Sequence, residues 1–248
     1  MRVLFQSPAH RNVAFEDLSE GGMVQANQHL LISGSEAMLL DPGGHKVYTK
    51  LIAALGAGIA PARLTHLFFS HQDPDIVAAA NGWLMMTDAT GYLSACWLRF
   101  LQHFGVDDLI VKRVRAIPDR GMTLEVGGTQ LKLIPAHFLH SPGNFQVYDP
   151  AARILYSGDL GASLGQPYAD VPDFDQHVQY MDGFHRRFMA SPVALRAWAV
   201  MARTLDIEIL APQHGAMFVG REKVQRFIDW IEVLPCGPEL LEHNCVVP

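Results

Sequence analysis

Imidazole and carboxylate side chains alternate in one short loop of this 248-residue chain: His71, Asp73 and Asp75. The loop follows the apolar residues 67–69, which predict the end of a buried strand. Alternate residues of an extended segment point to the same side, so the three side chains can face one cleft. Imidazole nitrogens and carboxylate oxygens bind transition metals. The loop therefore predicts part of a metal site, and the other interpretation of Asp75 is a helix N-cap.

Three further donors occupy comparable positions later in the chain: His140, Asp159 and His214. Each follows an apolar run and has serine or glycine beside it, so each is expected in a loop after a strand. Loops at one rim of a sheet are common places for binding sites. Together with the first loop they supply three imidazoles and three carboxylates, enough to hold two metal ions close together.

The donor set bears on which metal is held. Zinc sites favour nitrogen and sulfur donors, whereas mixed imidazole and carboxylate sites with open positions suit non-haem iron. Three carboxylates also offset much of the charge on two divalent ions. The sequence therefore favours two iron ions, with manganese and zinc as the alternatives.

Composition limits the class of protein. The chain is 49% hydrophobic, which provides a sizeable core for one large domain or two small ones. Its net charge of −6 and the lack of a basic run do not favour a nucleic-acid partner. The N-terminus turns polar too soon for a signal peptide, and no apolar stretch reaches the ~18 residues of a membrane span. Cys96, Cys236 and Cys245 form no CxxC pair, which favours a reduced, cytoplasmic setting.

The expected elements form clusters of strands with helices between and after them. Strands are expected at residues 29–32, 37–41 and 64–70, in a meander over 113–134, and at 145–148, 153–156 and 207–211. Helices are expected at residues 47–57, 75–86, 95–104, 174–189, 192–204 and 221–233. Two sheets faced by helices and a single α/β sheet both suit this order.

The motifs resemble the metallo-β-lactamase superfamily, and most of all its diiron branch, the flavodiiron proteins and the shorter oxygen-binding diiron proteins. In that branch the loop reads His-x-Glu-x-Asp, and later segments read His-x-Pro, Ser-Gly-Asp and Ala-Pro-x-His-Gly. The corresponding segments here are residues 71–75, 140–142, 157–159 and 211–215. Residues 27–32 are similar to an early Asn-x-Tyr-Leu strand, and the resemblance covers residues 24 to about 220.

The resemblance implies an α/β fold, the αββα metallo-β-lactamase sandwich of two mixed sheets flanked by helices. It implies one metal-binding domain over residues 1–248. It also implies a ligand set, in which one metal binds His71, Asp73 and His140, the other binds Asp75 and His214, and Asp159 bridges the two.

Two positions depart from the family pattern. Asp73 stands where the diiron proteins usually carry glutamate, and Ile76 stands where the superfamily carries a final histidine. The second metal then lacks one ligand, which a water, another side chain or an open position must replace. A small diatomic molecule could bind at an open position.

The implied function is a non-haem diiron protein that binds O₂, NO or peroxide, as a sensor or as a reductase. In flavodiiron proteins an FMN-binding domain follows the metal domain, whereas this chain ends soon after His214. No FMN domain is therefore expected, and the expected partners are a separate electron-transfer or signalling protein. The lack of an electron-transfer domain favours sensing. A homodimer is retained as a candidate assembly.

The alternative function is a dinuclear metal hydrolase of a phosphodiester, thioester or lactone, in which a metal-bound hydroxide attacks the substrate. Asp73 and Ile76 count against it because they depart from the zinc-hydrolase loop. A metal-free interaction protein is a third interpretation, and six retained donors count against that one.

Other residues have both a structural and a functional interpretation. Metal-bound histidines usually need a partner on the second ring nitrogen, and three histidines are candidates for that role, although structural roles are simpler: His29, His137 and His185. Four apolar residues at helical spacing predict a core face, or a hydrophobic wall over a gas-binding site: Met181, Phe184, Phe188 and Met189.

Overall fold

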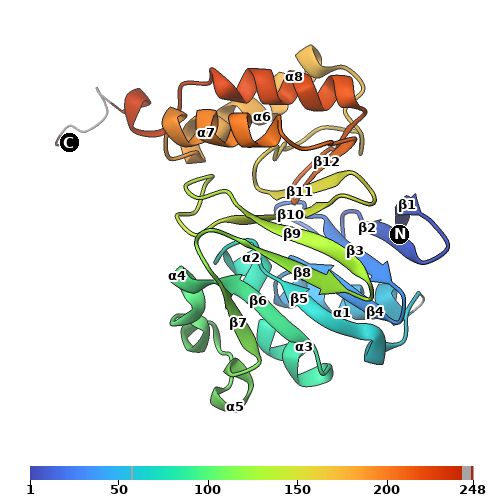
Figure 1. Cartoon of the computed structure of the whole chain (residues 1–248). Coiled ribbons are helices and arrows are strands. Elements are labelled where there is room, and N and C mark those ends of the chain that lie inside the picture. The colour runs from blue at the N-terminus through green and yellow to red at the C-terminus, as the bar shows by residue number, and fades with distance from the viewer. Residues whose placement is uncertain (57, 242–246, 248) are drawn as a thin grey trace.

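Two β-sheets lie face to face in the computed structural model, which describes residues 1–56, 58–241 and 247. Helices cover the outer face of each sheet (Figure 1). This arrangement confirms the predicted αββα sandwich, and the single-sheet alternative is wrong.

The first sheet comes from the N-terminal half of the chain, and its seven described strands lie in sequence order from β1 to β7. Strands β1 to β4 pair antiparallel, and β4 to β7 pair parallel. The strands are β1 (Arg2–Gln6), β2 (His10–Phe15), β3 (Gln28–Ser33), β4 (Glu36–Leu40), β5 (Leu64–Phe68), β6 (Thr90–Ser94) and β7 (Val114–Ile117).

The second sheet has the order β13-β12-β11-β10-β9-β8 over the described residues. Only β11 and β12 pair parallel among these neighbours. The strands are β8 (Met122–Val126), β9 (Thr129–Pro135), β10 (Phe145–Asp149), β11 (Ile154–Gly158), β12 (Ile209–Pro212) and β13 (Phe218–Val219).

The helices divide between the two outer faces (Figure 1). Those beside the first sheet are α1 (His45–Gly56), η1 (Pro61–Arg63), α2 (Pro74–Val77), α3 (Ala80–Met86), α4 (Ala95–Leu98), η2 (Leu101–Phe104) and α5 (Asp108–Val111). Those beside the second sheet are α6 (Phe174–Phe188), α7 (Pro192–Ala202), α8 (Arg221–Glu232) and η3 (Gly237–Leu240). No helix of the described residues has both the length and the apolar character needed to cross a membrane.

The buried apolar side chains form three layers, because each sheet is covered on both faces. Trp83 and Leu67 lie in the layer between the first sheet and its helices. Phe68 and Phe145 lie between the two sheets, and Phe227 lies between the second sheet and its helices. Burial of these surfaces is the main driving force for the fold. It fixes the two sheets in one relative position, which any site built from both of them requires.

Some expected elements differ from the structure. The helix expected over 75–86 is two helices, α2 and α3. The backbone changes direction at Ala79 (φ −92°, ψ 4°), and Trp83 and Leu84 of α3 are buried in the core. The helix expected over 95–104 is α4 followed by the tighter η2. Strands β1, β2, β6 and β13 were not expected from the pattern, because they are short or lie near a sheet edge.

The meander expected over 113–134 is wrong as a single unit. Strand β7 completes the first sheet, whereas β8 and β9 belong to the second. The chain crosses between the sheets through Gly121, which has φ +76°. A Cβ atom there would lie 2.3 Å from the carbonyl oxygen of Leu133, so only glycine fits this crossing.

Asp149, at the end of β10, is a fully buried carboxylate that joins the two sheets. It accepts hydrogen bonds from His10 Nε2 (2.5 Å) and Asn12 Nδ2 (2.7 Å) of β2. It also accepts from the backbone N–H groups of Ala151 and Ala152 in the β10–β11 turn. Burial alone would raise the pKa of Asp149, but these hydrogen bonds lower it. The carboxylate is therefore charged and fully partnered.

We expect Asp149→Ala to lower the free energy of unfolding of the metal-free protein by roughly 3–5 kcal/mol, because it leaves three buried donors and the N–H group of Ala151 without their acceptor. Urea denaturation followed by circular dichroism measures the change. Glu125→Ala, on an exposed position of β8, is the control and should change stability by less than about 0.5 kcal/mol. Equal effects of the two substitutions would contradict the role of Asp149.

Candidate metal centre

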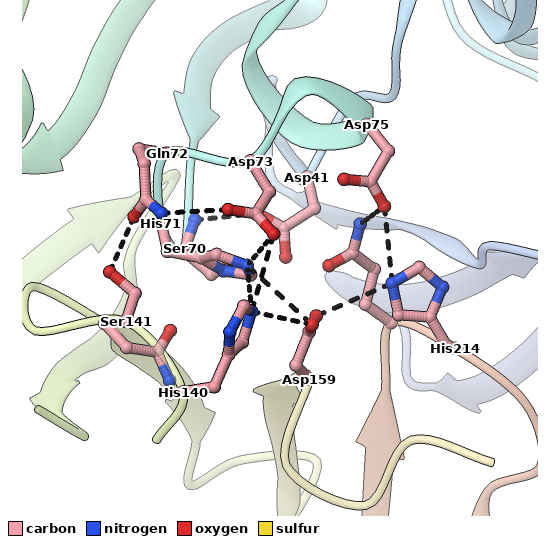
Figure 2. A network of polar contacts seen from close by, with 12 residues as sticks. Asp41, Ser70, His71, Gln72, Asp73, Asp75, His140, Ser141, Asp159 and His214 are labelled. Carbon is pink, nitrogen blue, oxygen red and sulfur yellow. Dashed lines mark hydrogen bonds and ion pairs between the residues drawn. The ribbon is translucent and has the colours of Figure 1, made fainter. Parts of the chain in front are cut away.

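The six predicted donor residues gather at one rim of the sandwich, three from each sheet (Figure 2). The loop after β5 of the first sheet carries His71, Asp73 and Asp75. Three loops of the second sheet, after β9, β11 and β12, carry the others: His140, Asp159 and His214. The predicted convergence of these loops is therefore what the fold produces.

Four donors form a tight first group: His71, Asp73, His140 and Asp159, whose donor atoms all lie within 4.8 Å of one another. The Nε2 atoms of His71 and His140 are 3.1 Å apart. Asp159 Oδ2 is 3.0 Å from His140 Nε2 and 3.8 Å from His71 Nε2. Asp73 Oδ2 is 3.5 Å and 3.7 Å from the same two nitrogens.

This spacing fits one metal ion. Donor atoms about 2.1 Å from a common ion are separated from one another by roughly 3.0–3.4 Å, close to the distances within the first group. Two carboxylates that face one point also repel each other unless a positive charge lies between them, and a metal ion supplies that charge when the imidazoles are neutral. Both the geometry and the charge therefore suit a metal.

A second group lies beside the first and shares Asp159 with it. His214 Nε2 is 3.3 Å from Asp75 Oδ2 and 3.6 Å from Asp159 Oδ1. The two oxygens of Asp159 thus face different groups: Oδ2 faces His71 and His140, and Oδ1 faces His214 (Figure 2). This is the arrangement that a carboxylate bridging two ions requires.

Asp159 is buried, and its Oδ1 atom has no hydrogen-bond partner among the described residues. Burial alone would raise the pKa of its carboxyl group, but the charges of His71, His140 and His214 and the hydrogen bond from His140 lower it well below the usual range. The same pairing acts on the histidines. Burial would lower the pKa of His214, but Asp75 and Asp159 raise it to about 9. The pKa of His71 is raised in the same way by Asp159 and Asp73.

The tautomers of two histidines leave Nε2 free for a metal. His214 Nδ1 lies 2.6 Å from the carbonyl oxygen of Gln25, which can only accept, so this nitrogen carries the proton. His71 Nδ1 lies 2.9 Å from the hydroxyl of Ser70, which can accept in the same way. Partners of this kind on the second ring nitrogen are usual for metal-bound histidines.

Hydrogen bonds hold the two loops of the first group together. Gln72 Nε2 donates to Asp73 Oδ1 (2.9 Å), which leaves Asp73 Oδ2 facing the histidines. Ser141 Oγ donates to Gln72 Oε1 (2.6 Å) and accepts from Trp97 Nε1 (3.2 Å). The loop of Asp73 is thereby fixed to the loop of His140 (Figure 2).

The buried Asp41, directly after β4, anchors the end of β5. Its Oδ1 accepts the N–H of Ser70 (2.7 Å), the residue before His71. Burial raises the pKa of Asp41 to about 6, although Ser70 and His71 act in the opposite direction. Asp41 was not singled out in the sequence, and its position after a strand and before Pro42 was the available signal.

Gly215 allows His214 to reach the site. It has φ +82°, and a Cβ atom at this position would lie 2.1 Å from Ser163 Oγ and 2.3 Å from the carbonyl oxygen of Ser163. Any larger residue would push the loop of His214 away from the loop that follows Asp159.

The N-cap interpretation of Asp75 is wrong. Asp73 occupies the N-cap position of α2, and it makes no capping hydrogen bond with its side chain. Asp75 lies in the first turn, and its side chain is 44% exposed beside His214. Ile76 is fully buried in the core beside the first sheet, so it points away from the donors.

The three other candidate histidines have partners outside the donor set. His29 is buried against the ring of Tyr156, and His137 contacts the carbonyl oxygen of Asp119. His185 accepts a hydrogen bond from the N–H of Gly161 (2.9 Å) and contacts the carbonyl oxygen of Met181. His185 therefore holds the loop after Asp159 through its hydrogen bond with Gly161.

A cavity of about 440 Å³ opens onto the donors. Its apolar wall includes Met23, Leu164, Phe184 and Phe188. Phe184 and Phe188 stack on each other with ring centroids 5.0 Å apart, and both lie edge-on to His140. The core interpretation of the helical spacing is confirmed for Met181 and Met189, which are buried in the core, whereas Phe184 and Phe188 line this cavity. A larger groove of about 660 Å³ lies along α7 and contains none of the six donors.

The family comparisons agree with this site. A family model described as "ODP family beta lactamase" matches residues 24–215. Among solved structures, the chain is similar to the chemotaxis sensor ODP in its peroxy diiron species, with 37% identity, coverage of 98% of this chain and 99% of that chain, and a TM-score of 0.88. The apo state of the chemotaxis sensor ODP from T. denticola is 35% identical, with 98% and 97% coverage and the same TM-score.

Longer and more distant relatives match this chain over only part of their length. Diflavin flavoprotein A 1 from Synechocystis sp. is 27% identical over 213 residues, which are 82% of this chain and 36% of that protein. The chain thus spans about a third of the length of this curated relative. The flavodiiron protein from Giardia intestinalis is 15% identical, with coverage of 94% of this chain and 59% of that chain and a TM-score of 0.76, and it shares the fold.

We expect metal binding to release protons and to strengthen with pH. With a pKa of about 9, His214 is protonated at neutral pH in the metal-free protein, and an ion must displace that proton. Protons stop competing with the metal ion for His214 as pH rises through about 9. The apparent affinity for the metal should therefore rise by about tenfold per pH unit between pH 6 and 8 for each proton released. Anaerobic calorimetric titration with Fe²⁺, in buffers of different ionisation enthalpy, measures the proton count. An affinity independent of pH would contradict this assignment.

Proposed function

The chain belongs to the ODP β-lactamase family, and from this we propose that it is a non-haem diiron protein that binds O₂ or a related diatomic molecule. In the proposal one iron binds His71, Asp73 and His140, and the other binds Asp75 and His214. Asp159 bridges them. The observation that carries the proposal is the placement of the Asp159 carboxylate, with one oxygen toward each group of donors.

The donor set supports iron. Three carboxylates and three imidazoles contain no sulfur, and mixed imidazole and carboxylate sites suit non-haem iron better than the nitrogen and sulfur donors that zinc favours. When bound, two ferrous ions would supply electrons to O₂ or NO, which no side chain of the site can do. The polypeptide orients the donors, keeps Nε2 of His71 and His214 unprotonated toward the site when metal is bound, and surrounds the open side with apolar groups.

The cavity supports a small, uncharged ligand. Its described lining contains no lysine or arginine, and the three carboxylates Asp73, Asp75 and Asp159 face it. An anionic phosphodiester would be repelled unless the metals alone attracted it. The apolar wall of Phe184, Phe188 and Leu164 suits a diatomic gas, because ligand pockets are mostly apolar with a few polar groups at the reacting end.

The family relationship favours a sensor of the diatomic molecule over an enzyme that reduces it. The 37% identical relative is a chemotaxis sensor, and it matches this chain over almost its full length. We propose that residues 1–248 act as one metal-binding domain in the cytoplasm and pass the bound state to a separate signalling protein. Reduction of O₂ or NO would need an electron-transfer protein instead. A homodimer remains part of the proposal.

The hydrolase alternative has less support. Ile76, in the place of a superfamily histidine, is buried in the core and supplies no ligand to a second zinc. A neutral thioester or lactone would still fit the cavity, so zinc content and hydrolysis belong in the test.

We expect protein expressed and purified anaerobically to contain about two irons per chain, and Asp159→Ala to lose at least one of them because the shared donor is removed. Metal analysis by mass spectrometry measures the content. Asp182→Ala, which removes a partly exposed α6 carboxylate paired with Arg186 and is not one of the six donors, is the control that should keep both irons. Stoichiometric zinc together with rapid phosphodiester, thioester or lactone cleavage would replace the diiron proposal with the hydrolase.

We expect O₂ added to the reduced two-iron protein to produce a new absorption band in the near-ultraviolet or visible range. Phe184→Ala should shorten the lifetime of this band several-fold, because water gains access beside His140, while both irons remain bound. Stopped-flow absorption measures the lifetime, with Val193→Ala on the exposed side of α7 as the control. No spectral change in the iron-loaded protein would rule out O₂ binding.

A further inference from the structure

Gln213, the residue before His214, has a buried side-chain oxygen without a partner. The residue is 2% exposed, and its Oε1 atom makes no hydrogen bond with any residue that the structure describes. Its Nε2 atom donates to Asp75 Oδ2 at 3.3 Å. Buried polar atoms in folded proteins nearly always have a partner. Oε1 of Gln213 therefore calls for a partner outside the polypeptide.

The contact with Asp75 fixes which way the amide faces. A carboxylate oxygen can only accept, so the NH₂ end of Gln213 must be the end beside Asp75, and Oε1 is the free end. The same oxygen of Asp75 lies 3.3 Å from His214 Nε2. The side chains of Gln213 and His214 thus converge on one atom of the second donor group, although the two residues are consecutive.

The backbone of Gln213 is held on both sides. Its N–H donates to the carbonyl oxygen of Gly158 (2.8 Å), the residue before Asp159. Its own carbonyl oxygen accepts from the N–H of Asn27 (2.6 Å). The amide is therefore presented from a fixed position between the loops of Asp159 and His214.

The second group is also the one that lacks a donor. The first group has four residues, whereas the described residues give the second group Asp75, His214 and one oxygen of Asp159. We infer that Gln213 Oε1 is a further protein ligand of the second metal, in the place of the histidine that Ile76 replaces. This inference rests on the proposed two-iron site.

An amide oxygen changes the character of the second position. It is a hard donor, which suits Fe²⁺ or Mn²⁺ better than zinc. It is also neutral, so it completes coordination without adding a fourth negative charge to the three carboxylates. The site then keeps room for one small ligand on the same ion.

The test compares Gln213→Leu with Gln213→Glu in the full chain. Anaerobic ⁵⁷Fe²⁺ titration gives the affinity of each equivalent, and Mössbauer spectra show which iron environment is lost. We expect the leucine variant to weaken the second equivalent by about 10–100-fold and to leave the first unchanged. The glutamate variant should keep or strengthen the second equivalent, because a carboxylate oxygen replaces the amide oxygen.

The glutamate variant distinguishes two roles of Gln213, that of a metal ligand and that of a group that only orients Asp75. If Gln213 merely donates to Asp75, glutamate would repel that carboxylate, and both variants would weaken the second equivalent; this result would overturn the inference. Unchanged binding in both variants would overturn it as well. Gln213→Met repeats the leucine test if that variant does not fold.

Two further comparisons make the result specific. Gln72→Leu, which removes the amide beside Asp73, should weaken the first equivalent instead of the second. Wild-type protein that binds fewer than two irons would overturn the proposed function itself, whereas an unchanged affinity of the leucine variant for the second iron would overturn only the role of Gln213.

Discussion

The site depends on keeping the Asp159 carboxylate charged although the residue is almost entirely buried. Burial opposes that charge, and the imidazoles of His71, His140 and His214 outweigh burial. Those imidazoles come from both sheets, so the charge persists only if the two sheets stay in register at this rim. The buried apolar layers, the Asp149 cluster at a different strand end and the tight loops at Gly121 and Gly215 all serve this register.

Much of this rim could be predicted from the sequence. The alternation of His71, Asp73 and Asp75 after an apolar run was enough to predict that they face one cleft, because side-chain direction in an extended loop is a local property. The later donors were recognised from their positions at strand ends. The interactions that hold the donors could not be predicted in the same way. Ser141 and Gln72 lie 69 positions apart, and only the packed sandwich brings them together.

In the fold, too, the features set by neighbouring residues could be predicted, whereas those set by residues far apart in the sequence could not. The bounds of long amphipathic helices such as α6 and α8 were predicted to within one residue, because the apolar spacing of a helix is a property of one continuous segment. The choice between one sheet and two was not available from pattern, since it depends on where the chain crosses at Gly121. Strand β1 is only partly buried, and β6 contains a glycine. Such strands are recognised only from their neighbours.

The equal contribution of the two sheets to the rim has a mechanical consequence. Each ion would bind side chains from both sheets, so its bonds would join one layer of the sandwich to the other. Among the described residues, these donors lie at one end of the layers. A change in the separation of the two ions, or in the length of one bond, would therefore act on both layers at once. The outer helices pack directly against these sheets, so the metal centre and the helical surfaces share the same two layers.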